Sequence, residues 1–280
     1  MKRLLSLFTT FILIFPALAG NDAPVSGGQA QGMGGTGVTL RDTWSLFNNV
    51  GGLAGLDKPS VGLFFERRFA TNAFNVGALA VAFPGQRWGA AGLSFRRFGT
   101  DLYNEQRLGL AYGHKLGEVT LGAQAEYLQT AIAEVGTRHA FVLNLGGVAS
   151  ILPHLHFGAY IFNVTQTRLA DYLDERVPTV MKAGLSYRPT DALMINLETE
   201  KDLDYPALVR AGVEYRIIPE VALRTGISTD PSVFYFGAGF TRHQFALDYA
   251  LSTHPSLGLS HHLSLQYRFD VRKKKPTPAS

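Results

Sequence analysis

Cysteine is absent from the 280 residues of this chain. A chain without cysteine has no disulfide framework, no thiol nucleophile and no thiolate metal ligand. An excess of one charge is lacking as well, because residues 20–269 carry 20 basic and 21 acidic residues and the surplus bases lie at 2–3 and 272–275. A nearly neutral body excludes the basic surface that nucleic-acid binding requires, so we expect no nucleic-acid partner.

Long hydrophobic runs are also missing, with one exception at the N-terminus. Residues 4–15 are predominantly apolar, Lys2 and Arg3 precede them, and the A-x-A sequence Ala17-Leu18-Ala19 follows. This order is typical of a cleaved secretory signal peptide over residues 1–19, with a retained anchor as the alternative. The mean hydropathy of +0.06 is far too low for a helical membrane protein.

The sequence instead alternates between apolar and polar or small residues with period two, from Ser60 to Phe269. Successive side chains of a strand point to opposite faces, so each segment has one apolar face. Segments of about ten residues match tilted strands that cross an outer membrane. We count fourteen of them, with twelve or sixteen as alternatives: 60–69, 74–83, 87–98, 103–115, 118–129, 137–151, 154–164, 177–188, 191–200, 206–217, 220–228, 232–241, 243–252 and 257–269.

The connections between these segments alternate in length. Those after even-numbered segments are short and several carry proline, whereas the longest, Thr165–Arg176, follows an odd one. A soluble sandwich or lipocalin-like barrel is the alternative fold, but soluble barrels have about eight strands and fourteen would enclose a very wide dry interior. The sequence therefore predicts an all-β, antiparallel transmembrane β-barrel in the cell outer membrane, contacting outer-membrane lipid, with both termini on the periplasmic side.

The stretch between signal and barrel has a different pattern. Residues 26–37 are rich in glycine, and Leu40, Trp44 and Phe47 form one apolar stripe of a helix predicted over 40–48. Thr39 with Asp42 three residues later indicates a capping box at its start. We expect this segment, 20–59, to fold as a short N-terminal plug.

Residues 32–38, Gly-Met-Gly-Gly-Thr-Gly-Val, and residues 49–54, Asn-Val-Gly-Gly-Leu-Ala, resemble the N-terminal signature of the FadL/PorV group of outer-membrane barrels. The resemblance implies a fourteen-stranded barrel (60–269) whose N-terminal segment enters the lumen. Val50 and Gly51 depart from the proline and alanine of the group, and long outer loops are missing. The tail, 270–280, is basic and expected to be disordered. The signature residues that the resemblance singles out are Gly34, Gly35, Trp44, Phe47, Asn49 and Gly52.

Two functions follow from the resemblance. The first is that of PorV- and PorQ-type proteins of the Bacteroidetes, which are accessory or scaffold barrels for type IX secretion and surface attachment, with secretion-system proteins as partners. The alternative is transport of small hydrophobic molecules such as fatty acids. The short outer loops favour the first, whereas transport predicts an apolar pocket beneath the Thr165–Arg176 loop and a gap or kink in a nearby strand.

Charged residues of both signs occupy the non-apolar face of the predicted strands. An Arg or Lys facing lipid at mid-membrane costs about 2–4 kcal/mol, so these residues are expected to face the lumen. They could line a conduit or gate, or form packed ion pairs that support the plug. The candidates are Arg96, Arg107, Glu126, Lys182, Glu198, Arg210, Glu214, Arg224, Asp248 and Arg268.

Catalytic and metal motifs are weak throughout. His262 and Ser264 share a face but no third residue orients the histidine as a base, and His154 with His156 has no further ligand nearby. We therefore expect no enzyme activity, no metal site and no cofactor.

Overall fold

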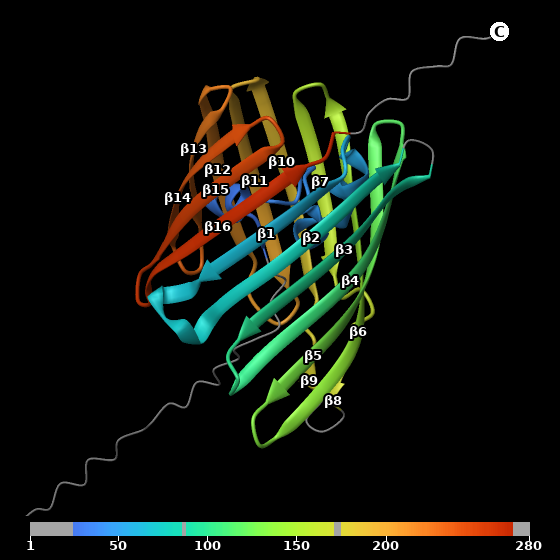
Figure 1. Cartoon of the computed structure of the whole chain (residues 1–280), viewed down its shortest axis with the longest axis vertical. Coiled ribbons are helices and arrows are strands. Elements are labelled where there is room, and N and C mark those ends of the chain that lie inside the picture. Colours follow the sequence, from blue (N-terminus) through green and yellow to red (C-terminus); the bar gives the residue numbers. More distant parts are fainter. Residues whose placement is uncertain (1–24, 86–87, 171–174, 271–280) are drawn as a thin grey trace, which may run out of the picture.

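Fourteen strands close into one antiparallel barrel in the computed structural model, which describes residues 25–85, 88–170 and 175–270 (Figure 1). Each strand pairs with its neighbour in sequence, and β1 pairs with β16 to complete the wall. The predicted fold class and the count of fourteen are confirmed, and every segment boundary was within three residues. The strands of the wall are β1 (Ser60–Arg67), β2 (Asn75–Gly85), β3 (Gly89–Gly99), β4 (Tyr103–Leu116), β5 (Val119–Ile132), β6 (Gly136–Leu152), β7 (Leu155–Phe162), β10 (Val180–Thr190), β11 (Leu193–Asp202), β12 (Leu208–Ile218), β13 (Val221–Ser228), β14 (Val233–Arg242), β15 (Phe245–His254) and β16 (Gly258–Arg268).

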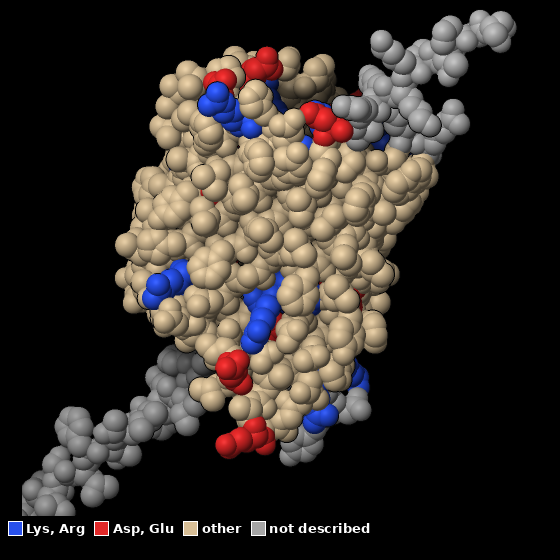
Figure 2. Space-filling model, viewed as in Figure 1, with Lys and Arg blue, Asp and Glu red and all other residues tan. Residues whose placement is uncertain are grey.

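The apolar face of the wall points outward. On β16, Leu263 and Leu265 are 45% and 41% exposed. The residues that alternate with them, Ser264 and Gln266, are buried in the lumen. Figure 2 shows the consequence on one face, where a wide band around the middle of the barrel carries no charged side chain. This arrangement is that of a membrane barrel, because a soluble barrel would turn its aliphatic side chains inward.

The two ends of the barrel differ in their connections. At the short-turn end, only two residues separate β4 from β5, β6 from β7, and β10 from β11. At the opposite, long-loop end, residues 163–179 connect β7 to β10 and contain a small two-stranded sheet, β8 (Arg168–Ala170) and β9 (Glu175–Arg176). The alternation of connection lengths agrees with the prediction, although the β8–β9 sheet was not predicted.

The described part of the N-terminal segment lies inside the barrel, coloured blue in Figure 1. Its apolar side chains form two buried clusters with lumen-facing side chains of the wall, so the core of the molecule is the interface between plug and wall. The predicted signal peptide and the tail beyond Asp270 lie outside the described residues. Within the described ranges, no helix is long and apolar enough to cross a membrane. The helices are α1 (Gly28–Gly32), α2 (Ser45–Asn48), and the 3-10 turns η1 (Val50–Gly55), η2 (Arg68–Ala70) and η3 (Asn72–Phe74).

The helix predicted over 40–48 is wrong at its start, because α2 begins at Ser45. The N-cap of α2 is Trp44, which has no side-chain cap. Just before the helix, the Asp42 carboxylate accepts the Trp44 N–H at 2.9 Å, and the Ser45 hydroxyl oxygen accepts the Asp42 N–H at 3.1 Å. Thr43 instead donates its hydroxyl hydrogen to Ser60 on the wall. Contacts with the wall thus override the local helical preference of residues 40–44.

Candidate functional site in the barrel lumen

Glycines of the wall form the seat on which the plug rests. A Cβ at Gly212 would lie 2.2 Å from the Met33 carbonyl oxygen, and one at Gly158 would lie 2.3 Å from that of Val38. Real Cβ atoms do not approach so closely, so each of these positions admits only glycine while the plug is in place. Wall glycines whose added Cβ would meet the plug within 3.3 Å are Gly62, Gly92, Gly113, Gly122, Gly146, Gly158, Gly184, Gly212, Gly226 and Gly237.

An ion-pair network fixes the first part of the plug. Arg224 on β13 donates to Glu214 at 2.6 Å and to Asp248 at 2.7 Å. The positive charge of the buried guanidinium is thus paired with two carboxylates. The plug joins this network through Gln29, whose side-chain amide donates to Glu214 at 2.8 Å. Here the lumen charges act as packed ion pairs that support the plug.

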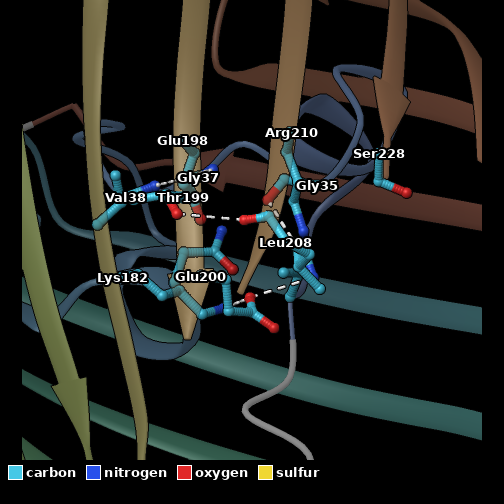
Figure 3. Close-up of polar contacts among 12 residues, drawn as sticks. Gly35, Gly37, Val38, Lys182, Glu198, Thr199, Glu200, Leu208, Arg210 and Ser228 are labelled. Carbon is cyan, nitrogen blue, oxygen red and sulfur yellow. Dashed lines mark hydrogen bonds and ion pairs between the residues drawn. The ribbon is translucent and has the colours of Figure 1, made fainter. Parts of the chain in front are cut away.

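A second network, which we call the latch, holds residues 35–38 against β10, β11 and β12 (Figure 3). The Glu198 carboxylate accepts the backbone N–H groups of Gly37 and Val38 at 2.8 and 2.9 Å. Beside it, Glu200 lies 3.1 Å from both Lys182 and Arg210, and Arg210 also donates to the Gly35 carbonyl at 3.4 Å. Backbone groups that lack a secondary-structure partner are therefore satisfied by charged side chains of the wall.

The six signature residues are all buried within the plug. Gly34 and Gly35 adopt positive φ values of 75° and 80°, a conformation that L side chains rarely adopt. The Asn49 side chain donates to the carbonyls of Val38 at 2.6 Å and Gly147 at 3.0 Å, so it ties two parts of the plug to the wall. Their placement agrees with a structural role for this segment.

Asp42 is the plug residue whose ionisation is most strongly perturbed. Burial raises the pKa of its carboxyl group from 3.8 to about 6, even though the backbone N–H of Trp44 stabilises the ionised form. The carboxyl group therefore changes charge in a pH range where an exposed aspartate is already ionised.

The lumen candidates from the sequence separate into three sets. Most are buried in the lumen, Arg210 is half-buried in the latch, and Arg268 lies exposed at the short-turn rim, beyond the last buried position of β16. Charged residues that our list omitted are also buried there, namely Glu66, Glu105 and His262. Strand parity could have found all three, because each shares a face with inward-pointing neighbours, as Glu105 does with Arg107 two residues later. The buried candidates are Arg96, Arg107, Glu126, Lys182, Glu198, Glu214, Arg224 and Asp248.

One part of the wall is not made of paired strands. β6 pairs with β7 only from Leu145 onward, although β6 itself begins at Gly136. The loop 163–179 covers this free edge through single contacts: the Val164 N–H donates to the Leu143 carbonyl at 2.8 Å, and the Thr167 hydroxyl donates to that of Phe141 at 2.8 Å. At the long-loop end, loop contacts thus take the place of the regular β6–β7 ladder.

Side chains from this loop reach the lumen. Leu169 and Val177 are buried in the same cluster as Phe162, Leu128 and Val142 of the wall. The apolar pocket expected beneath Thr165–Arg176 stays a prediction, because residues 171–174 of that loop lie outside the described residues.

Metal-binding geometry is not found in the part of the chain that the structure describes, where no three histidine, aspartate or glutamate side chains converge. His262 and Ser264 both face the lumen, and His262 contacts Ser252 at 3.1 Å rather than Ser264. His154 and His156 lie at and beside the turn between β6 and β7.

No protein-family model and no curated relative matches this sequence. Solved structures do match: the toluene transporter TodX of P. putida has a TM-score of 0.65 at 12% identity, over 90% of this chain and all of TodX. The CymD monoaromatic hydrocarbon channel has a TM-score of 0.64 at 12% identity, covering 89% and 98% of the two chains. A FadL homologue of Pseudomonas aeruginosa has a TM-score of 0.63 at 13% identity, covering 90% of this chain and all of that one. The chain thus has the FadL-like outer-membrane barrel fold.

Proposed function

We propose that this barrel transports small hydrophobic molecules through the outer membrane and releases them sideways into the bilayer, between β6 and the loop 163–179. The observation that carries the proposal is the loop-filled part of the wall, where a few loop contacts replace a strand pair. The glycine-seated plug occupies the lumen, so a route along the barrel axis requires the plug to move, whereas a sideways route does not.

The similarities to known structures favour transport over our first expectation, a secretion scaffold of PorV type. The named neighbours are hydrocarbon channels and transporters, and their likeness to this chain spans about nine tenths of it. We propose the cell outer membrane as the location, with the short-turn end and both termini on the periplasmic side, as in bacterial barrels with short periplasmic turns.

An engineered disulfide tests the sideways route. Replacing Leu143 and Val164 by cysteine places two thiols at the loop contact with β6, and the absence of native cysteine leaves this pair as the only thiols in the chain. The matched control joins Leu145 and Ile161, which are directly opposite one another where β6 and β7 are paired.

Toluene uptake into proteoliposomes is the measurement. We expect oxidation of the Leu143–Val164 pair to lower uptake at least tenfold, to the rate of protein-free vesicles, and reduction to restore it. The Leu145–Ile161 control should transport equally well oxidised or reduced. Equal uptake by the oxidised and reduced forms of the first pair would contradict the sideways route.

A further inference from the structure

Two arginines face each other inside the barrel, and of the two only Arg107 forms an ion pair with a carboxylate of the described residues. Arg96 on β3 and Arg107 on β4 are directly opposite in the ladder, and both are buried in the lumen, 5% and 3% exposed. Like charges in directly opposite positions of a sheet repel one another. Such a pair is expected only where something else stabilises it.

The hydrogen-bonding groups of the pair are largely unsatisfied. Arg107 has no hydrogen bond from any of its three guanidinium nitrogens, and its single ion pair, Nη2 to Glu105 Oε2, is long at 3.6 Å. The Nε of Arg96 also lacks a hydrogen-bond partner, and no carboxylate of the described residues lies within ion-pair distance of Arg96. Glu66 and Glu105 act on Arg96 only through space. Burying guanidinium N–H groups without acceptors is costly, so an acceptor from a ligand would be bound strongly.

Aromatic rings lie next to these guanidinium groups. The Arg107 Cζ lies 5.1 Å above the ring of Phe162, and on the same side of the lumen Arg68 lies 5.6 Å above Phe98. A planar guanidinium stacks on aromatic faces and binds a carboxylate through two parallel hydrogen bonds. Two neighbouring guanidinium groups with aromatic rings beside them match a ligand that is itself planar and carries a carboxylate.

We propose that Arg96 and Arg107 bind the carboxylate of a small aromatic acid and make the barrel selective for aromatic acids over neutral hydrocarbons. This inference rests on the proposed transport function and names the substrate class of the same lumen. It differs from the TodX and CymD neighbours, whose names specify toluene and monoaromatic hydrocarbons.

Entry of the acid requires the described parts of the connection between β7 and β10, residues 163–170 and 175–179, to move. The unpaired nitrogens of Arg107 have no contact with solvent, and Leu169 and Val177 of the loop pack into the cluster that contains Phe162. The same loop covers the free edge of β6. We therefore expect the oxidised Leu143–Val164 disulfide described above to slow binding as well as release.

The test is isothermal titration of the purified, full-length barrel in maltoside detergent with three probes. Benzoate is the aromatic acid, benzyl alcohol its neutral analogue and octanoate the aliphatic acid of similar size. We expect benzoate to bind at least tenfold more tightly than the other two. Equal binding of benzyl alcohol would overturn the role of the arginines, and equal binding of octanoate would overturn the preference for an aromatic ring.

Substitutions separate binding from folding. Arg96→Met and Arg107→Lys should each weaken benzoate binding at least tenfold, because the first removes one charge and the second removes the planar fork. Arg97→Met is the matched control, since Arg97 is the next residue on β3 but half-exposed on the outer face. The altered mobility of folded barrels on unheated denaturing gels reports folding. Unchanged benzoate affinity in folded Arg96→Met protein would overturn the proposal.

The same protein in vesicles distinguishes this inference from the transport function on which it rests. If toluene crosses but benzoate neither binds nor crosses, transport stands and the acid site is wrong. If benzoate binds but neither compound crosses faster than through protein-free vesicles, the site stands and the transport function is wrong.

Discussion

Two of the buried arginines in the lumen, Arg224 and Arg96, differ in the partners of their guanidinium groups. Arg224 lies where the plug meets the wall, and two carboxylates approach its guanidinium within 2.7 Å. Arg96 lies toward the long-loop end of β3, faces another arginine and has no carboxylate of the described residues in ion-pair distance. The Arg224 guanidinium is thus paired closely within the chain, whereas the arginine pair has one long ion pair, from Arg107 to Glu105 at 3.6 Å, and several nitrogens without a hydrogen-bond partner. A structural role and a binding role can be told apart by this difference.

Replacing Arg224 by methionine should lower the free energy of unfolding, whereas replacing Arg96 by methionine should not. Arg224→Met leaves Glu214 and Asp248 buried without their cation, so we expect a loss of about 3–5 kcal/mol in the free energy of unfolding. Arg96→Met removes a repulsive buried charge and should leave the ligand-free barrel equally stable or more stable, by up to about 4 kcal/mol. Urea unfolding of both variants in detergent measures the two effects. Equal destabilisation by both would remove the distinction between the two sites.

The plug region should also carry a pH dependence of stability. The pKa of the Asp42 carboxyl group is about 6 in the folded protein, against 3.8 for an exposed aspartate. Between these two pH values the folded protein keeps a proton that the unfolded chain has lost. The protonated carboxyl group therefore contributes its full stabilisation below about pH 4. This contribution is lost as the pH rises to about 6, which lowers the free energy of unfolding by roughly 3 kcal/mol.

Asp42→Asn tests this directly, because the amide oxygen can still accept the Trp44 N–H but the side chain does not ionise. The variant should match the parent protein at low pH and be more stable above pH 6. Asp101→Asn, at a fully exposed turn position, serves as the control. A parent protein whose unfolding midpoint is constant between pH 4 and 7 would contradict the assignment to Asp42.

The glycine seat should be less sensitive to substitution than the Arg224 ion pairs. Gly212→Val places a side chain where the Met33 carbonyl oxygen already lies, so the plug must shift, at a cost of about 1–3 kcal/mol. Gly77→Val is the matched control on β2, where an added Cβ has no neighbour within 4 Å. Limited proteolysis of the plug and single-channel conductance should both increase in Gly212→Val alone. A tightly closed, protease-resistant Gly212→Val barrel would show that the plug does not rest on this residue.

The smallest effect is expected in the latch. Glu198→Gln keeps an acceptor for the N–H groups of Gly37 and Val38 but removes its negative charge, which should cost about 1–2 kcal/mol. Hydrogen exchange at these two amides should accelerate about tenfold, while exchange elsewhere in the wall stays unchanged. Thr199→Ser, at the exposed position next to Glu198, is the control. Faster exchange throughout β11 would indicate loss of the strand rather than of the latch.

Most of the wall could be predicted from the sequence, because a period-two pattern determines which residues face lipid and therefore where each strand lies. Leu263 and Ser264 illustrate the rule. The plug was harder to predict. The pattern of residues 40–44 indicates a helix, yet Thr43 donates a hydrogen bond to Ser60 of the wall, a tertiary contact that the local pattern does not contain. Parity indicated that Arg96 and Arg107 face inward, but it could not show that they face each other, because strand register is set by pairing across the whole barrel.

The glycine seat also limits how the chain can vary in length. Inserting two residues into one strand would keep every side chain on its original face, so the lipid-facing surface would survive. It would nevertheless displace that strand's glycine by about 6.6 Å along the strand, away from the plug. Strand register and the path of residues 25–59 therefore have to change together, and relatives with longer strands should show compensating changes in their N-terminal segments.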